Sequence, residues 1–486
     1  MKSLLKAVLT VSLSAILATS LAACGSGNTS NNAGGNNTQE GVNNSTDKVE
    51  VYAENNLPKN EKVTLKVGFF EGGMGREWFD YAMGTFKEKF PNVSFDVTYS
   101  PSIQKITTTK IAANDDKDMF DLFSGSIAGG ITSYVAAGKL ESQEDLWDRA
   151  AYDGNGKTLK ELSFEGSFES MKRTLGETYD FPISASGSGL MFNKTLFEEN
   201  GWNQSPKTWS EFLELGDAIK AAGITPITFP GLYPNYIENA LGNQKVYELA
   251  EINGNLDQVL DNYRNFKLPY YLADENVELW NRIFELGEKG YFPNGLAALN
   301  HTQSQMQVIQ GKAAMVSTGT WVENEMKEST PDGFKWGYMT VPFGDDPEST
   351  KWTRFSPGSG FLMWTGKPDL NKQWSKEFIV WLWNLDNQAV IAEKGGMIPL
   401  RADFADDAER MGKLQSLSSA FLDYVNNNNI KMDSGNSNVV LTDAAFEQAK
   451  KVIVEATTEI ASGKLAPLPT LEKAEALLEQ AIKAQK

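Results

Sequence analysis

The chain has almost no cysteine or histidine: Cys24 is the only cysteine and His301 the only histidine in 486 residues. A lone cysteine cannot form an intramolecular disulfide, so stability must come from a hydrophobic core, and 41% of the residues are hydrophobic. His301 has no cysteine partners with which to build a zinc site. We therefore predict that the protein holds neither a metal nor a cofactor.

Several catalytic motifs are also absent from the sequence. G-x-S-x-G, H-E-x-x-H and P-loop patterns do not occur, and Ser-His-Asp catalysis would depend wholly on His301. A glycoside hydrolase needs only two carboxylates about 5 to 9 Å apart, and the chain has 63 acidic residues. We expect no enzyme, but a secreted carbohydrate-active enzyme stays as an alternative.

Basic residues are fewer than acidic ones, which gives a net charge of −18. Removal of residues 1–23, with Lys2 and Lys6, would lower the net charge to −20. This acidity argues against nucleic acid or an anionic membrane surface as a partner. After Ala23, no apolar run is long enough to span a membrane.

The N-terminus has the pattern of a secretory signal. A basic start precedes an apolar run over residues 7–23, which is shorter than the roughly 20 residues of a membrane-spanning helix. The run ends in Leu-Ala-Ala-Cys24, which resembles the bacterial lipobox. The resemblance implies cleavage of residues 1–23 and a lipidated Cys24 carrying diacylglycerol and palmitate.

Residues 24–61 are predicted to be a flexible tether. Residues 25–47 are almost entirely Gly, Asn, Ser and Thr, which offer too little apolar area to offset the entropy of ordering. A flexible chain of about 35 residues reaches roughly 30 to 35 Å. We therefore expect a domain held near the outer face of the cytoplasmic membrane by its lipid alone.

Hydrophobic periodicity after the tether predicts an α/β fold. Residues 63–70 alternate as a strand, 78–86 have helical spacing, and 93–99 alternate again. A helix over 103–113 and a buried strand over 119–123 follow. Further on, Thr208 and Glu211 are spaced as a capping box before a helix that ends near Gly223, and residues 224–229 read as a strand. Residues 281–289, 374–385 and 443–461 have helical periods.

Segments along almost the whole chain resemble family 1 extracellular solute-binding proteins, the sugar-capturing lipoproteins of bacterial ABC importers. In chain order these segments are VTLKVGFF, FKEKFPNVSFDV, YVAAGKLESQEDL, FPISASGSGLMFNKTLFEENGW, PKTWSEFLELGDAIKAAGITPIT, IQGKAAMVSTGTWVENEM, WGYMTVPFG and GGMIPLR. One departure is the Asp-Met-Phe-Asp run over residues 118–121, where many members have Pro-Asp-Val.

The resemblance implies two α/β lobes joined by a hinge that the chain crosses more than once. We expect crossings at residues 182–186, near 331 and near 385. The first lobe would comprise residues 62–183 plus 333–384, and the second 184–332 plus 385–486.

Ligands of open α/β sheets bind beyond the carboxyl ends of the strands. Glu71 follows the first predicted strand, and Ser124 and Ser126 follow residues 119–123, so we predict that these three contact the ligand. The run Gly-Gly-Met-Gly over residues 72–75 would let backbone approach closely, but it lacks the spacing of a nucleotide fingerprint.

Sugars present apolar faces and polar rims, which match aromatic rings and planar polar side chains. Trp321 follows a strand-like segment where the family places a loop facing the cleft, and Trp352 with Arg354 is a second candidate pair. Trp78, Tyr233 and Tyr236 are further stacking candidates. Packing in the core is the alternative for each of these aromatic residues.

The segment that begins at His301 and Gln305 resembles the branch of the family that binds N-acetylglucosamine and its dimer chitobiose. We therefore expect a monomeric receptor that captures an oligosaccharide, first of all this amino sugar, by hinge closure. The resemblance implies ABC permease subunits as partners. A sugar sensor that works with a membrane receptor is an alternative, because the fold cannot separate sensing from import.

Overall fold

We describe the computed structural model of the protein for residues 50–125, 127, 130–164, 168, 171, 173–358, 360–433 and 437–485. The predicted signal, Cys24 and most of the predicted tether lie outside these residues, as does Ser126. The described end of the predicted tether is packed, not flexible: Leu57 is buried in the core, and the Tyr52 ring meets Phe90 edge to face with centroids 4.9 Å apart. The tether prediction is therefore wrong for residues 50–61. Within them, no helix is both long and apolar enough to cross a membrane.

A first sheet has the strand order β2-β1-β3-β9, built from β1 Val63–Phe70, β2 Val93–Ser100, β3 Leu122–Phe123 and β9 Leu362–Met363. The first three strands run parallel and β9 runs antiparallel to β3. Val63, Leu65, Val67 and Phe69 are buried, as the alternating pattern predicted. The predicted strand over 119–123 is confirmed only for its last two residues.

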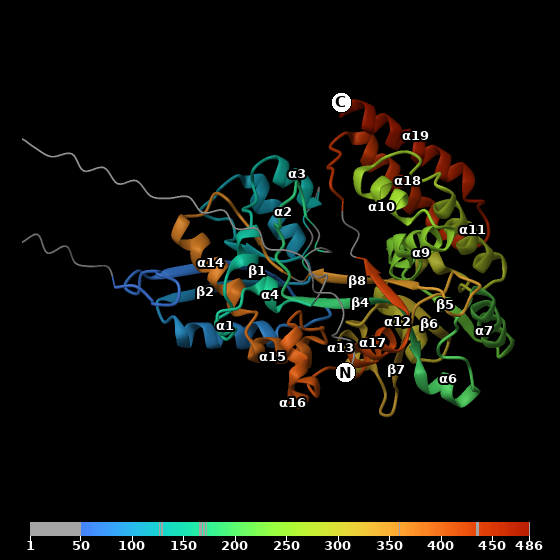
Figure 1. The fold of residues 1–486 in the computed structure, drawn as a ribbon, viewed down its shortest axis with the longest axis horizontal. Coiled ribbons are helices and arrows are strands. Elements are labelled where there is room, and N and C mark those ends of the chain that lie inside the picture. The colour runs from blue at the N-terminus through green and yellow to red at the C-terminus, as the bar shows by residue number, and fades with distance from the viewer. Residues whose placement is uncertain are drawn as a thin grey trace, which may run out of the picture. The chain divides into compact units, whose positions relative to one another are not determined.

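A second sheet has the order β10-β8-β4-β6-β5, and β7 pairs with the far half of β4. Its strands are β4 Ser184–Asn193, β5 Thr225–Thr228, β6 Ala313–Gly319, β7 Trp336–Met339, β8 Lys351–Gly358 and β10 Ile430–Asp433. β4 is buried along its whole length and lies between β8 and β6 (Figure 1). This sheet is mixed, because β5–β6 and β8–β10 are parallel pairs.

Helices cover both sheets. Before β4 they are α1 Glu77–Lys89, α2 Ile103–Ala113, α3 Gly130–Ala136 and α4 Leu159–Leu162. Between β4 and β8 they are α6 Lys194–Asn200, α7 Trp209–Ala221, α8 Glu238–Leu241, α9 Asn243–Asn253, α10 Leu256–Asn265, α11 Asp274–Glu288, α12 His301–Ile309 and α13 Val322–Glu325. After β9 they are α14 Asp369–Trp381, α15 Leu385–Gly395, α16 Ala408–Met411, α17 Ser416–Asn427, α18 Ala444–Ala461 and α19 Leu468–Ala484.

The start of α7 differs in one detail from the capping box that the sequence predicted. The Thr208 hydroxyl accepts a hydrogen bond from the backbone N–H of Glu211 at 3.2 Å. The Glu211 carboxylate, however, accepts from the backbone N–H of Lys207 at 2.7 Å and so reaches one residue further back than in the standard motif.

Strand pairing changes where we place the hinge crossings. β4 begins at Ser184, within the range 182–186 where we expect the first crossing, and that crossing stays a prediction. β7 and β8 belong to the second sheet, so the return to the first sheet lies between β8 and β9 and not near residue 331. α15 packs on α1, and α17 packs on β7 (Figure 1), so we infer that the third crossing follows α15 at residues 396–400 and not near 385.

Candidate functional site

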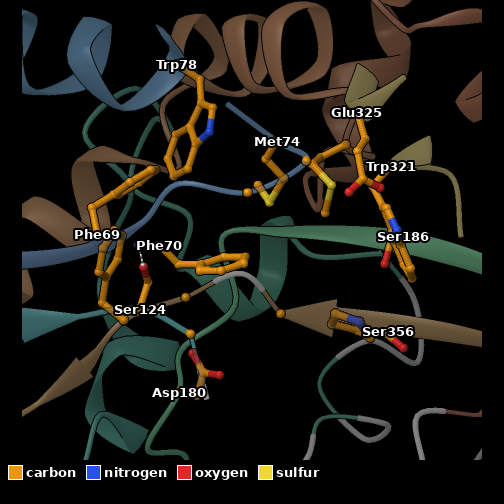
Figure 2. A pocket seen from close by; sticks show the side chains of 18 of the residues that line it. Phe69, Phe70, Met74, Trp78, Ser124, Asp180, Ser186, Trp321, Glu325 and Ser356 are labelled. Atoms are coloured by element: carbon orange, nitrogen blue, oxygen red, sulfur yellow. Dashed lines mark hydrogen bonds between the residues drawn. The ribbon is translucent and has the colours of Figure 1, made fainter. Parts of the chain in front are cut away.

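A cavity of about 560 Å³ lies at the carboxyl ends of β1 and β3. Phe69, Phe70 and Ser124 line it from these strand ends, and Trp78 lines it from α1. The opposite wall comes from the second sheet and its helices: Tyr236, His301, Trp321 and Glu325. Ser186 of β4 and Ser356 of β8, which face each other in the antiparallel register, line it where the chain crosses between the sheets (Figure 2).

Phe70 is the last residue of β1, and its side chain projects into the cavity (Figure 2). It is 46% exposed, which is unusual for a phenylalanine. Its backbone N–H donates to the Ser124 hydroxyl at 2.8 Å, which joins the ends of β1 and β3. The ring lies over Gly72, where an added Cβ would come within 2.3 Å of it. The glycine therefore leaves the space that this ring occupies.

Trp321 lies after β6 and directly before α13. Its ring lies over Gly319, the last residue of β6, where an added Cβ would come within 2.0 Å of the indole. The indole is half-buried and lines the cavity (Figure 2). Phe70 and Trp321 thus both need a neighbouring glycine to place their rings in the cavity wall.

A hydrogen-bonded group of polar side chains lies in the wall beside Trp321. His301 and Gln305 are one turn apart on α12, so their side chains share a face. His301 Nε2 lies 2.9 Å and Gln305 Nε2 lies 2.8 Å from Oε2 of Glu325. Because a carboxylate only accepts hydrogen bonds, His301 Nε2 must carry a hydrogen, and the Gln305 amide donates to Glu325. Both side chains therefore hold Glu325 in place.

Tyr236 completes this wall. Its ring meets the His301 ring edge to face, with centroids 4.8 Å apart, and its backbone carbonyl accepts from the Ser317 hydroxyl at 2.7 Å. Burial raises the pKa of Tyr236 to about 12, and the negative charge of Glu325 adds to the shift. The phenol is therefore protonated and can donate a hydrogen bond at neutral pH.

A direct hydrogen bond joins the two walls. The Asn324 side-chain amide on α13 donates to the backbone carbonyl of Gly73, in the loop after β1, at 2.6 Å. Gln415 in turn donates to the Asn324 side-chain oxygen at 3.1 Å and to the Glu393 carbonyl at 3.0 Å. An added Cβ on Gly73 would lie 3.1 Å from Cβ of Glu325, so the loop and α13 are in close contact.

The structure brings together several residues that the sequence predicted as ligand contacts. Trp78, Ser124, Tyr236, His301 and Trp321 line the cavity, and Gln305 is buried behind His301. Trp78 is only 3% exposed, so most of its indole packs in the core. The ligand-binding role of these residues stays a prediction.

Other predicted contacts do not line this cavity. Trp352 is 6% exposed, and its indole N–H donates a hydrogen bond to the Glu251 carboxylate at 2.7 Å. Trp352 lies near the start of β8, whereas the opposite end of that strand lines the cavity. Arg354 lies between them on the same strand. Tyr233 is 54% exposed and is not among the lining residues. Glu71 is not among them either, and its carboxylate lies 4.0 Å from Arg76 Nη1. These four residues are not among those that line the cavity, and their role in binding stays a prediction.

Sequence reasoning did not select several lining residues. They include Phe70, Met74, Asp180, Ser186, Glu325, Ser356 and Met397. Phe70 could have been found, because it ends a strand beside the predicted Glu71. The two serines could not, because only the pairing of β4 with β8 brings them together.

The chemistry of the lining is aromatic and acidic. Among the described residues that line the cavity there is no lysine or arginine, whereas Asp180 and Glu325 provide carboxylates. In the described parts of the chain, no group of three or more His, Cys, Asp or Glu side chains could hold a metal ion. The cavity can therefore offer ring faces to apolar surface and carboxylates to hydrogen-bond donors.

The sequence profile of a family described as bacterial extracellular solute-binding protein matches residues 82–415. The chain is 23% identical over 304 residues to the diacetylchitobiose binding protein NgcE of Streptomyces coelicolor, and the match covers 62% of this chain and 62% of NgcE. It is 24% identical over 338 residues to the sn-glycerol-3-phosphate-binding periplasmic protein UgpB of Brucella abortus, with 68% and 72% covered.

Solved structures share the fold at low sequence identity. A chitin oligosaccharide binding protein superposes with a TM-score of 0.65 at 18% identity, covering 86% of this chain and 99% of that one. The raffinose complex of the solute-binding protein RafE gives a TM-score of 0.62 at 17% identity, with 86% and 100% covered. These structures confirm the two-lobed α/β fold.

Proposed function

Because this chain belongs to the family of bacterial extracellular solute-binding proteins, we propose that it captures a carbohydrate in the cavity and delivers it to an ABC permease. One observation carries the proposal: the ring of Phe70 comes from the first sheet, whereas Trp321 and Glu325 come from the second. A saccharide between them would meet ring faces and hydrogen-bond acceptors from both walls.

Hinge closure is the proposed capture mechanism. A ligand shifts the protein toward the closed state only through contacts that it makes better in that state. Phe70 and Trp321 lie on opposite walls, so a bound sugar touches both rings only when the walls approach each other. The closed form then docks on the permease.

An oligosaccharide of amino sugars is the proposed first ligand, with N-acetylglucosamine and chitobiose as examples. NgcE is named for diacetylchitobiose, and the structural relative is named for chitin oligosaccharide. In this chain, His301, Gln305 and Glu325 form a polar wall beside Trp321, which suits the polar rim of a sugar.

Lipid anchoring through Cys24 at the outer face of the membrane is part of the same proposal. A tether that ends before residue 50, where the chain begins to pack on the domain, would let the receptor reach the permease while it stays at the membrane. A receptor in this place loses less captured sugar by diffusion than a freely secreted one.

Calorimetric titration of the purified protein tests this function. The panel contains N-acetylglucosamine, its β-1,4 dimer, maltose, xylobiose and galacturonate, and reducing ends are followed in parallel with soluble polysaccharide. We expect tight binding of one sugar without turnover, and Trp321→Ala should weaken it by roughly 1 to 3 kcal/mol. Release of new reducing ends would show an enzyme instead, and unchanged affinity in Trp321→Ala would remove this residue from the site.

A further inference from the structure

The described lining of the cavity has more acidic than basic side chains, and His301 is its one basic residue. Asp180 and Glu325 are the ionisable carboxylates of the lining, and no lysine or arginine is among the described lining residues. Proteins usually bind phosphate and carboxylate groups through arginine, lysine or a helix N-terminus. The described lining therefore offers an anionic solute no lysine or arginine, and at His301, where α12 begins, the Glu325 carboxylate already lies 2.9 Å from the imidazole.

Glu325 is held so that its charge faces the cavity. Its Oε2 atom is hydrogen-bonded by Gln305, which is neutral, and by His301. No ion pair of Glu325 with a lysine or arginine occurs among the described residues; His301 is its one basic partner there. This negative charge also affects Tyr236 in the same wall. The pKa of Tyr236 is raised mainly by burial, and the charge of Glu325 raises it further.

The aromatic residues of the cavity suit a cation as well as a sugar. The face of an aromatic ring carries partial negative charge and attracts an ammonium group within about 6 Å of its centroid. Phe70 offers such a face from β1, and Trp321 offers the larger indole beside Glu325. A ligand with both an apolar sugar face and an ammonium group would use the rings and the carboxylate together.

We propose that the cavity selects saccharides by charge and favours one that carries a free, protonated amine. This inference rests on the proposed function and specifies the class of its ligand. Among the amino sugars proposed above, saccharides of unacetylated glucosamine are the fitting class and should bind more tightly than the N-acetylated examples. Neutral sugars of the same shape bind more weakly, and uronic acids or sugar phosphates are excluded, because each would place a negative charge beside Glu325.

Matched β-1,4-linked dimers test the proposal by calorimetry on the purified protein. They are the dimer of glucosamine, cellobiose, the dimer of N-acetylglucosamine and the dimer of galacturonate, at about pH 6, where an alkyl amine is protonated. Cellobiose differs from the glucosamine dimer by a hydroxyl in place of each amine. A hydrogen bond between charged groups contributes more binding free energy than a neutral one. The difference corresponds to a roughly tenfold lower Kd for the glucosamine dimer than for cellobiose.

Two substitutions separate the charge from the shape of the site. Glu325→Gln keeps the side-chain size and removes the charge, so the Kd ratio of cellobiose to the glucosamine dimer should fall to about one third or less of its wild-type value. Glu328→Gln removes the same charge from an exposed position three residues away, outside the cavity lining, and should leave the ratio unchanged. A purely structural role of Glu325 would weaken both dimers alike and leave the ratio intact.

The outcomes distinguish this inference from the function on which it rests. A glucosamine dimer that binds no tighter than cellobiose or the N-acetylated dimer, while some sugar of the wider panel binds, overturns charge selection and leaves sugar capture standing. Tight binding of the galacturonate dimer does the same. If no saccharide binds at all, both the inference and the proposed function are wrong.

Discussion

Replacement of Phe70 by alanine should weaken ligand binding without abolishing the fold. An aromatic side chain buries about 150 to 250 Å² in full, so a ring that is 46% exposed leaves roughly 90 Å² for a ligand. A sugar that covers half to all of this area gains about 1 to 2 kcal/mol at 25 cal/mol per Å². Phe70→Ala should therefore raise Kd by about 5- to 30-fold.

Calorimetry with the sugar that binds wild-type protein measures this change. Phe70→Tyr keeps the ring and should keep an affinity within about twofold of wild type, since little apolar area is lost. Tyr81→Ala is the matched control, because Tyr81 on α1 is 40% exposed but does not line the cavity. If Phe70→Ala binds as tightly as Tyr81→Ala and both proteins remain folded, the ring of Phe70 is not a ligand platform.

Substitutions elsewhere in the chain have equally definite expected results. Gly319→Ala should displace the Trp321 ring, because an added Cβ would lie 2.0 Å from the indole. Sugar binding should then weaken by about 1 to 2 kcal/mol in calorimetry, and an unchanged affinity would contradict this expectation. Cys24→Ser should move the protein from the membrane to the medium in cell fractionation, and retention would refute lipid anchoring. Lys245→Met should cost about 3 to 5 kcal/mol in urea unfolding, because buried Glu248 would lose its ion-pair partner; a smaller loss would show that Glu248 is neutralised.

Local sequence patterns were sufficient to predict the elements that build the first wall of the cavity. The bounds of β1 and α2 match the predicted ranges, because each element buries residues at its own period of two or of about 3.6. The strand end at Phe70 then follows directly. By contrast, the hinge crossings depend on the pairing of β4 with β8, more than 150 residues later in the chain, and no local pattern records that pairing.

The two predicted tryptophans show where sequence reasoning reaches its limit. Trp321 and Trp352 both lie in or beside strands of the second sheet. Trp321 follows the end of β6 that reaches the cavity, whereas Trp352 lies about 13 Å along β8 from Ser356, which does reach it. Only the directions of the strands in the assembled sheet decide which indole enters the cavity.

Glu325 was likewise inaccessible to sequence reasoning, although the segment around it was recognised. The chain has 63 acidic residues, and nothing in the sequence around Glu325 distinguishes it from the others as a residue that lines the cavity. Its importance arises from α12, which places His301 and Gln305 within hydrogen-bond distance of one of its oxygens. The helical spacing of these two residues predicts that they share a face, but not what that face meets.

A crystal structure of the protein with the sugar that titration identifies tests the central claim most directly. The account predicts density for the saccharide between Phe70 and Trp321, with a hydrogen bond to Glu325 and contacts from both sheets. Density for the sugar elsewhere on the protein, or contacts from one sheet alone, would contradict capture between the two lobes.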